Sequence, residues 1–382
     1  SPKYSESGLA VINQRCIRGH KVNMEVARFH NLTVKKVNPE RIVQRGDVLI
    51  NSTGQGTLGR TAQILNLPPE PVTVDSHVTI ARPQAKLFYV PFFGYAVMRL
   101  EDAFIGMSTG TSGQTELGRK VISENCFVPI PPLDEQQEIV ALLDSAFEKI
   151  DKAKANVERN LKNAEELFQS ALDEVFSNPG EDWEVTSLGE ACVFIDYRGR
   201  TPKKTDNGIR LITAKNVRMG FVKIDPQEFI SSDEYEEWMT RGFPKKGDVL
   251  FTTEAPLANV AVFDFSEKIA LAQRIITLSP KAGLIGGFLS FHLQSRPSQV
   301  EILGHATGAT VSGIKSKLLK LVKVAFPPVV NQKEIVSRLD ALSGHRDEVV
   351  AKCKKELIDL EEMRQSILEQ AFVGKLTSTK SQ

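Results

Sequence analysis

The sequence is poor in cysteine and has no long apolar run. Its four cysteines, Cys16, Cys126, Cys192 and Cys353, lie far apart, and no two form a CxxC pair. A zinc site or redox motif is therefore not expected, and a reducing, cytoplasmic setting is. No apolar run approaches the ~20 residues of a membrane span, and no signal peptide is visible.

Net charge is also almost absent, at +1 for 382 residues, but it is unevenly distributed. Residues 1–125 carry a net charge of +5, residues 126–180 carry −6, and residues 181–326 carry +2. Because contact with phosphates needs positive charge, this pattern indicates nucleic-acid contact by the two basic stretches. The alternative is a protein with uneven charge and no such role.

The motifs of a self-sufficient enzyme are missing. There is no GxxxxGK[ST] loop and no Asn/Asp-Pro-Pro-Tyr/Phe methylation motif. GQGTLG at 54–59 fits the GxGxxG pattern, but LNLPPEP at 65–71 stands where the helix of a dinucleotide-binding unit would run. A turn, or a glycine loop near a DNA phosphate, is predicted instead. Asp75, Ser76 and His77 are not a triad, because adjacent strand residues point to opposite faces. No catalytic residue and no metal site is predicted.

The sequence does contain an internal repeat. PPLDEQQEIVALLD at 131–144 returns as PPVVNQKEIVSRLD at 327–340, with eight of fourteen positions identical. RGDVLINSTG at 45–54 echoes KGDVLFTTEA at 246–255. The period of 196 residues is too long for a solenoid. It predicts two copies of one unit, each a globular piece followed by a long helix.

The first copy is expected to begin incompletely. The second opens at Trp183 with WEVTSLGEACVFIDYRGRTP, and the counterpart of about twenty residues would precede Ser1. In the rest of the first piece, β-like runs at 48–50 and 72–81 and a helical pattern around Phe92–Leu100 are predicted.

A heptad seam follows each proline-led start, with apolar steps of four and three and one double step of four. The first seam is Ile139, Leu143, Ala146, Ile150, Ala153, Val157, Leu161, Ala164, Phe168, Ala171 and Val175. The second is Ile335, Leu339, Leu342, Arg346, Val349, Cys353, Leu357, Leu360, Arg364, Ile367 and Ala371. The matching steps predict helices that pack against each other, with two independent amphipathic helices as the alternative. The two arginines would need an acidic neighbour or a path to water.

The predicted fold class is α/β (α+β), with two globular domains joined by two long antiparallel coiled-coil helices as a pseudo-twofold internal repeat. The predicted domains are residues 1–130, a spacer helix at 131–178, a second globular domain at 179–326, a second spacer helix at 327–376, and a tail at 377–382.

Taken together, these features resemble the specificity subunit of type I restriction–modification enzymes. The residues that carry the resemblance are IPPLDEQ at 130–136, the paired GDVL strands, STGTSGQ at 108–114 and QAFVGKL at 370–376. The resemblance implies two target recognition domains on a rod of two antiparallel helices, each domain reading one half of a split double-stranded DNA target. It implies that the helices set the gap and dock two methyltransferase subunits, and through them nuclease–translocase subunits.

The resemblance also implies a non-catalytic chain that binds no cofactor of its own. S-adenosylmethionine, ATP and Mg are expected on the partner subunits.

Base reading needs Arg or Lys for guanine and Asn or Gln for adenine, and the candidates lie where the two copies match. In the first copy the predicted DNA contacts are Asn13, Gln14, Arg15, Arg18, Asn51, Ser52, Gln55, Arg60, His77, Thr109, Thr111, Ser112 and Gln114. In the second they are Arg198, Arg200, Lys203, Lys204, Lys215, Asn216, Arg218, Thr252, Thr253, Arg274, Thr307, Thr310, Ser312 and Lys315. YRGRTPKK at 197–204 is the densest basic patch and is predicted to meet phosphates, with a solvated loop as the alternative.

Three rival functions stay open at this level. They are a recognition subunit whose partners only methylate DNA, a coiled-coil scaffold without a DNA role, and an enzyme acting alone. Mild positive charge on both globular pieces, and the divergence between them, argue against the scaffold.

Overall fold

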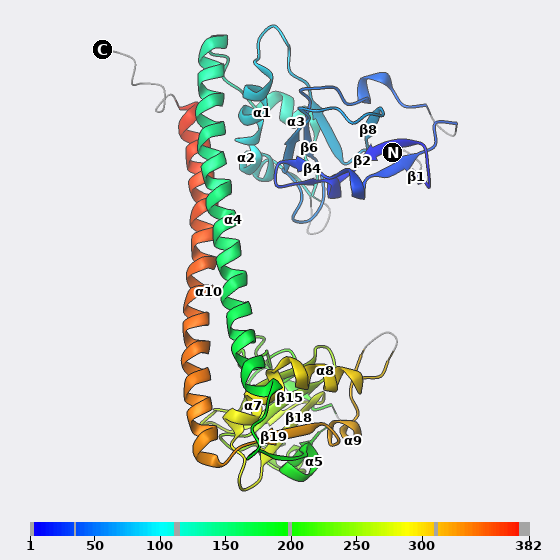
Figure 1. Ribbon diagram of the computed structural model, residues 1–382. Coiled ribbons are helices and arrows are strands. Elements are labelled where there is room, and N and C mark those ends of the chain that lie inside the picture. Colours follow the sequence, from blue (N-terminus) through cyan, green and yellow to red (C-terminus); the bar gives the residue numbers. More distant parts are fainter. Residues whose placement is uncertain (1–3, 34–35, 111–114, 198–200, 309–311, 374–382) are drawn as a thin grey trace. The chain divides into compact units, whose positions relative to one another are not determined.

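A computed structural model describes residues 4–33, 36–110, 115–197, 201–308 and 312–373 (Figure 1). Its contacts divide the chain into two compact units. Unit 1 contains residues 1–157 and 355–382, and unit 2 contains residues 158–354. Each unit combines a mixed α/β globular part with a portion of both long helices, which confirms the predicted fold class.

The described residues of unit 1 form two small sheets and a hairpin. Its four-stranded sheet has the order β1-β5-β2-β8, in which β2 and β8 run parallel, and its three-stranded sheet has the order β7-β6-β9. The strands are β1 (Tyr4–Ser5), β2 (Leu9–Ile12), the hairpin β3 (Ile17–Arg18) and β4 (Lys21–Val22), β5 (Arg28–His30), β6 (Val48–Asn51), β7 (Thr61–Gln63), β8 (Val72–Val74) and β9 (Val78–Ala81).

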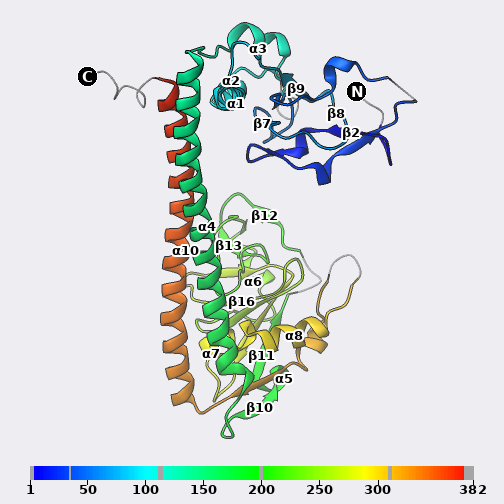
Figure 2. The same ribbon diagram turned by 45° about the horizontal axis from the view of Figure 1, so that its top comes forward.

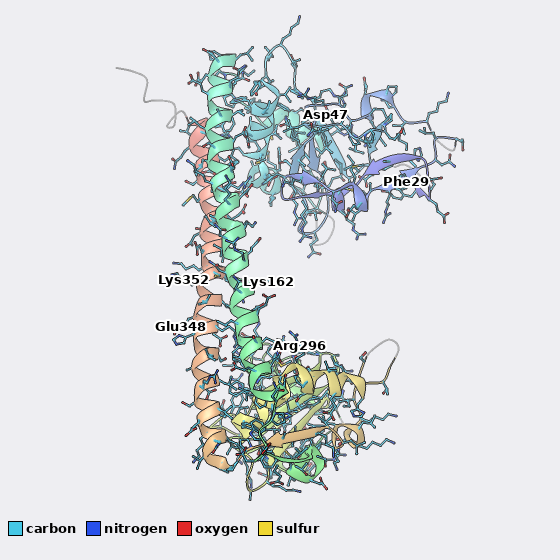
Figure 3. The ribbon with its side chains drawn as sticks, viewed as in Figure 1. Phe29, Asp47, Lys162, Arg296, Glu348 and Lys352 are labelled. Carbon is cyan, nitrogen blue, oxygen red and sulfur yellow. The ribbon has the colours of Figure 1, made fainter. Side chains whose placement is uncertain are left out.

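The predicted run at 72–81 is two strands in different sheets, not one. The Asp75 side chain turns the chain, since its Oδ1 accepts a hydrogen bond from the His77 backbone N–H at 2.9 Å. Such a side-chain-to-backbone bond two residues on stabilises a turn at Asp. Nearby, the buried Asp47 (Figure 3) pairs with Arg82 at 2.7 Å and fixes the end of β9 to the start of β6.

The described residues of unit 1 also form three short helices and three 3₁₀ turns. They are α1 (Val90–Met98), where a helix was predicted, α2 (Glu101–Gly106), α3 (Arg119–Asn125), and turns at Gln14–Cys16, Met24–Val26 and Pro39–Arg41.

Unit 2 repeats this plan with extra strands. Its sheets have the orders β11-β18-β15-β16 and β12-β14-β13-β17, and β10 pairs with β19. The strands are β10 (Glu184–Ser187), β11 (Cys192–Asp196), β12 (Lys204–Thr205), β13 (Ile209–Ile212), β14 (Phe229–Ile230), β15 (Val249–Thr253), β16 (Leu257–Val262), β17 (Ile269–Leu271), β18 (Ile275–Pro280) and β19 (Lys323–Phe326). The short helices are α5 (Leu188–Ala191), α6 (Tyr235–Trp238), α7 (Gly286–Gln294), α8 (Arg296–Gly304) and α9 (Ser316–Leu319).

The strand registers confirm the repeat residue by residue. In unit 1, β6 and β9 pair so that Val48 faces Ala81. In unit 2, β15 and β18 pair so that Val249 faces Leu278. The parallel pair β2–β8 likewise has its counterpart in β13–β17.

The two long helices are α4 (Leu133–Ser177) and α10 (Val329–Phe372). In unit 2, Phe168 of α4 lies under Arg346 of α10, and Glu174, further along α4, pairs with Arg338, which is earlier in α10. The helices therefore run antiparallel there (Figure 2). Of the predicted seam residues only Val349 is exposed, so the seam prediction is confirmed.

The globular part of each unit also contacts its own stretch of the long helices. In unit 1, Leu143, Ile150 and Leu368 share one buried core with Phe92 of α1. In unit 2, the backbone N–H of Arg296 (Figure 3), at the start of α8, donates to Asp173 of α4 at 3.0 Å.

A buried glutamine fixes the first turn of each long helix. Gln136 Oε1 accepts from the Tyr89 N–H at 2.7 Å, and its Nε2 donates to the carbonyls of Leu87 (3.0 Å) and Pro131 (2.8 Å). Gln332 makes the same three bonds, to the Ile285 N–H (2.9 Å) and to the carbonyls of Gly283 and Pro327 (both 2.7 Å). Both side chains are fully buried. This clamp joins the globular part of each unit to its helix.

Candidate nucleic-acid interface

In unit 1, the loops after β2 and β6 meet the turn before β9. Asn51 Nδ2 donates to the Gln14 carbonyl at 3.0 Å, and Thr53 Oγ1 donates to Gln14 Oε1 at 3.1 Å. Thr53 Oγ1 also lies 2.8 Å from His77 Nδ1. Three segments that are far apart in sequence are therefore joined by polar side chains.

A fourth segment joins the same place. The backbones of Thr109 and Glu116 exchange hydrogen bonds of 3.0 and 2.9 Å, and the Leu117 N–H donates to the Ser52 carbonyl at 2.8 Å. This arrangement sets Thr109 and the residues 116–117 beside the end of β6, while residues 111–114 of the predicted Gly/Thr/Ser segment lie outside the described residues.

GQGTLG at 54–59 forms a tight turn, as predicted. Gly54 has φ +105°, and a Cβ there would lie 2.3 Å from Thr57 Oγ1. The Thr57 and Leu58 N–H groups both donate to the Gly54 carbonyl at 3.0 Å. The chain then enters strand β7 rather than the helix that a dinucleotide-binding loop would need.

Unit 2 builds the same junction from different side chains. The Thr253 N–H donates to the Arg274 carbonyl at 2.9 Å, as the Ser52 N–H donates to the His77 carbonyl at 2.8 Å. The backbones of Thr307 and Gly313 exchange bonds of 2.9 and 3.0 Å, and the Ile314 N–H donates to the Thr253 carbonyl at 3.0 Å. His77 and Arg274 are thus structural equivalents. We call these two sets of converging segments the loop junctions of units 1 and 2.

Arg274 is held in an uncommon conformation. Its φ is +75°, which costs a side-chain-bearing residue about 1 kcal/mol or more. Its guanidinium is half exposed and pairs with Glu254 Oε1 at 2.7 Å. Within the described part of the chain four non-glycine residues have positive φ, and three of them, Ala255, Ala258 and Arg274, lie at or beside this junction. Backbone strain of this kind clusters at functional sites.

Six of the predicted base readers are buried, and their polar groups are mostly occupied inside the protein. Asn51 Nδ2 donates to the carbonyls of Gln14 and Thr57. Asn216 Nδ2 donates to three carbonyls, and Asn216 Oδ1 accepts from the Thr213 N–H. The buried six are Asn13, Asn51, Ser52, Asn216, Thr252 and Thr253. Their bonds shape the loops, so a base contact by these side chains would have to displace internal partners. Their DNA contact stays a prediction.

The other described candidates reach solvent. The exposed ones are Arg15, Arg18, Gln55, His77, Thr109, Lys203, Lys204, Lys215, Arg274, Thr307, Ser312 and Lys315, and the partly exposed ones are Gln14, Arg60 and Arg218. Lys204 pairs with Glu228 at 2.8 Å. Thr111, Ser112, Gln114, Arg198, Arg200 and Thr310 lie outside the described residues.

Basic side chains recur at equivalent positions of the two units. The bridge between Ile17 and Val22 in unit 1 matches the bridge between Val217 and Val222 in unit 2. The same offset of 200 residues places Arg15 opposite Lys215, and Arg18 opposite Arg218. Each unit therefore carries two equivalent cations, in the loop after β2 or after β13, that can meet phosphate or guanine.

Sequence reasoning missed Thr53 and Glu254, which occupy equivalent positions and hold His77 and Arg274. The offset of 201 residues between the GDVL strands could have paired them. Glu254 was not predicted because the rule of Arg or Lys for guanine and Asn or Gln for adenine leaves out carboxylates, although a carboxylate can accept a hydrogen bond from cytosine.

The described residues provide neither a metal-binding cluster nor a membrane-spanning helix. No group of three or more His, Cys, Asp or Glu side chains there could hold a metal ion. No helix among them combines the length and apolar character needed to cross a bilayer.

Comparison with known sequences gives a consistent result. A family profile described as the type I restriction modification DNA specificity domain matches residues 22–161 and 180–358. The chain is 23% identical to the MjaVIII specificity subunit of Methanocaldococcus jannaschii, over 90% of this chain and 82% of that one. It is 25% identical to the EcoKI specificity subunit of Escherichia coli K12, over 90% of this chain and 76% of that one.

Solved structures share the fold. One, from work on the assembly and conformational transition of the type I R-M system, has a TM-score of 0.72 at 22% identity, and the match covers 98% of this chain and 92% of that one. The HsdS subunit of Thermoanaerobacter tengcongensis has a TM-score of 0.53 at 21% identity, with 98% and 91% covered.

Proposed function

Because this chain belongs to the type I restriction modification DNA specificity domain family, we propose that it is the DNA sequence-recognition subunit of a type I restriction–modification complex. Each globular unit reads one half of a bipartite target. The paired helices set the unspecified gap and dock methyltransferase subunits. The chain itself is non-catalytic.

The observation that carries this proposal is the pair of loop junctions. One backbone pattern is repeated in both units, yet it presents a Thr–His pair in unit 1 and a Glu–Arg pair in unit 2. A constant framework with different hydrogen-bonding groups suits two domains that read different bases. It also explains why the target need not be a palindrome.

The equivalent cations of the loops after β2 and β13 supply the sequence-independent part of binding. Arg15, Arg18, Lys215 and Arg218 are placed to neutralise phosphates. His77 and Arg274, with Thr109 and Thr307 beside them, are the groups proposed to read base edges.

The partners follow from the proposed role. Two methyltransferase subunits bind this chain, and nuclease–translocase subunits bind through them. S-adenosylmethionine, ATP and Mg²⁺ are bound by those partners. The complex works in the cytoplasm, where its DNA target lies.

The test is a methylation map of genomic DNA. Cells would express the methyltransferase subunit of the same system, with and without this chain, and modified bases would be mapped by single-molecule sequencing. Methylation of one split motif with a fixed gap, present only when this chain is expressed, is the expected result. An identical map in both cultures would refute the proposal.

A second culture would carry this chain with residues 1–130 replaced by the corresponding domain of a relative. The expected map keeps one half of the motif and changes the other. A change in both halves would show that the two units do not read independently.

A further inference from the structure

One ion pair at the loop junction of unit 2 is replaced by a neutral pair in unit 1. Glu254 lies directly after β15 and Arg274 directly before β18, and these two strands pair with each other (Figure 1). Arg274 Nε lies 2.7 Å from Glu254 Oε1. At the equivalent positions of unit 1, Thr53 and His77 form a hydrogen bond of 2.8 Å. The ion pair is therefore part of what distinguishes the two units.

The backbone on both sides of this ion pair is anchored. The Arg274 carbonyl accepts a hydrogen bond from the Thr253 N–H at 2.9 Å. Glu254 forms a β-bridge with Gly313, whose backbone exchanges hydrogen bonds of 2.9 and 3.0 Å with Thr307. A guanidinium that is positioned in this way before DNA arrives loses little freedom on binding.

Fold stability does not account for the ion pair. Arg274 is half exposed and Glu254 is 38% exposed. Such a pair contributes little to stability, because water screens the charges and both side chains lose rotamer freedom. The φ of +75° at Arg274 strains the backbone by more than an exposed ion pair contributes. A strained residue that holds an exposed cation in one place points to a binding role.

The ion pair suits a base edge better than a phosphate. The charges of Arg274 and Glu254 cancel, and the carboxylate repels a phosphate, so little attraction to the DNA backbone remains. Nε faces the carboxylate, and no hydrogen bond to a described residue occupies Nη1 or Nη2. Two donors on one planar group match the O6 and N7 acceptors that guanine presents in the major groove.

We propose that Arg274 reads a guanine in the half of the target that unit 2 recognises, and that Glu254 is the positioning residue that holds the guanidinium for this contact. The inference rests on the proposed function. Adenine presents one acceptor and one donor at the same edge, so it would lose one hydrogen bond and set a donor against a donor. Cytosine and thymine do not present two acceptors there.

The test uses the assembled methyltransferase complex with the full chain, and DNA duplexes that carry the split motif defined by the methylation map. The half read by unit 2 is the one that stays unchanged when residues 1–130 are exchanged. Each base pair of that half is replaced in turn, and Kd is measured by fluorescence anisotropy. At one G·C pair, replacement should weaken binding at least about tenfold.

Arg274→Gln should remove the preference for guanine at that base pair and leave discrimination at the other pairs intact. Glutamine at 274 meets the same backbone strain, so the variant changes the side chain alone. Unfolding midpoints accompany each measurement. Arg274→Gly, which relieves the strain, is the second variant if Arg274→Gln does not fold.

Glu254 variants test the positioning role. Glu254→Gln keeps an oxygen that can accept a hydrogen bond from Arg274 Nε, so it should retain most of the preference for guanine. Glu254→Ala removes this partner, and the preference should fall at least about fivefold. A structural role alone would lower affinity for every duplex equally and would not be rescued by glutamine.

Salt dependence separates base reading from phosphate contact. The double variant Glu254→Ala/Arg274→Gln should keep the salt slope of binding to non-specific DNA, because the pair carries no net charge. Lys215→Ala, which removes an exposed and equivalent cation, is the matched control and should lower the slope by about one.

Four outcomes would overturn the inference and leave the proposed function intact. They are a unit 2 half without a G·C pair, an unchanged preference for guanine in Arg274→Gln, a lower salt slope in the double variant, and loss of discrimination at a second base pair in Glu254→Ala. The last would make Glu254 a base reader itself. Failure of the proposed function differs from all four, since no split motif would then depend on this chain, and the inference would fall with it.

Discussion

Arg364 of α10 donates from Nη1 to Asp151 Oδ1 of α4 at 2.7 Å, and its guanidinium lies 4.2 Å from the centroid of the Phe147 ring. Arg346 is placed in the same way over Phe168, also at 4.2 Å, with Asp347 at 2.7 Å. Both arginines that interrupt the second apolar seam therefore have an aromatic ring beneath them and a carboxylate beside them, as the sequence required.

Replacing Arg364 should destabilise unit 1 mainly through the lost ring contact. Arg364→Ala is expected to lower the free energy of unfolding by about 1–2 kcal/mol. Asp151→Asn should cost less than about 1 kcal/mol, because Asp151 is 60% exposed. Urea unfolding of the single and double variants measures the coupling. The control is Lys152→Ala, an exposed residue paired with Glu148, which should change little. Equal losses from Arg364→Ala and Lys152→Ala would contradict this account.

Removing the Gln136 clamp should be more costly. Gln136→Leu leaves the Tyr89 N–H and the carbonyls of Leu87 and Pro131 without this partner, and each buried unsatisfied group costs about 1–3 kcal/mol. We expect a loss of at least about 3 kcal/mol in thermal or urea unfolding. Gln137→Leu, one residue on and exposed, is the control and should be near neutral. A small effect of Gln136→Leu would show that the clamp is dispensable.

His292 should make unit 2 sensitive to acid. Burial lowers the pKa of His292 from 6.5 to about 4. The Ala325 N–H donates to Nε2 at 3.3 Å, so Nδ1 carries the proton and donates to Ser298 Oγ at 2.9 Å. Between pH 6.5 and 4 the unfolded chain binds this proton and the folded chain does not. The free energy of unfolding should therefore fall as pH falls through this window, by up to about 3 kcal/mol.

Unfolding midpoints at pH 7, 5.5 and 4.5 test this expectation. His292→Phe should flatten the dependence in that window, whatever its constant cost. His345→Gln should leave the dependence intact, because His345 is 78% exposed. An unaltered slope in His292→Phe would assign the acid sensitivity to other groups.

Replacing Arg274 should weaken DNA binding without lowering stability. Glycine accepts a φ of +75° without strain, so Arg274→Gly should leave the free energy of unfolding unchanged or raise it by up to about 1 kcal/mol. Affinity of the assembled complex for its specific DNA should fall by about 1–3 kcal/mol, with discrimination lost in one half-site. Lys246→Ala, an exposed cation paired with Asp264, is the control. Loss of stability together with intact binding would give Arg274 a purely structural role.

The long helices could be predicted from sequence because their signal is a simple period. Prolines at 131–132 and 327–328 mark their starts, and Asn178, Pro179 and Gly180 end α4. The prediction of a buried seam residue is wrong at one position, since Val349 is 41% exposed. The period assigns a side chain to a face of its helix, but whether that face meets a neighbour depends on residues elsewhere in the chain.

The DNA contacts of the loops were harder to predict from sequence, because the same polar side chain can either contact a base or hold the loop's own backbone. Asn51 and Asn216 carry the amide that suits adenine, and the fold uses that amide to hold carbonyls of its own loops. Arg15 and Lys215 were predicted by the same rule and are exposed. Burial separates the two roles, and it depends on the tertiary fold.

The glutamine clamp has a consequence for how such proteins diversify. All six of its hydrogen bonds go to backbone atoms. One partner is a proline in both units, Pro131 and Pro327, but the side chains at the other two places differ, with Leu87 and Tyr89 in one unit and Gly283 and Ile285 in the other. The glutamine clamp can therefore form with globular parts that have different side chains at these positions. Recombination within the proline-led segments could exchange the whole globular part of one unit and keep its packing on the helix. A new DNA sequence preference could then arise in one genetic step.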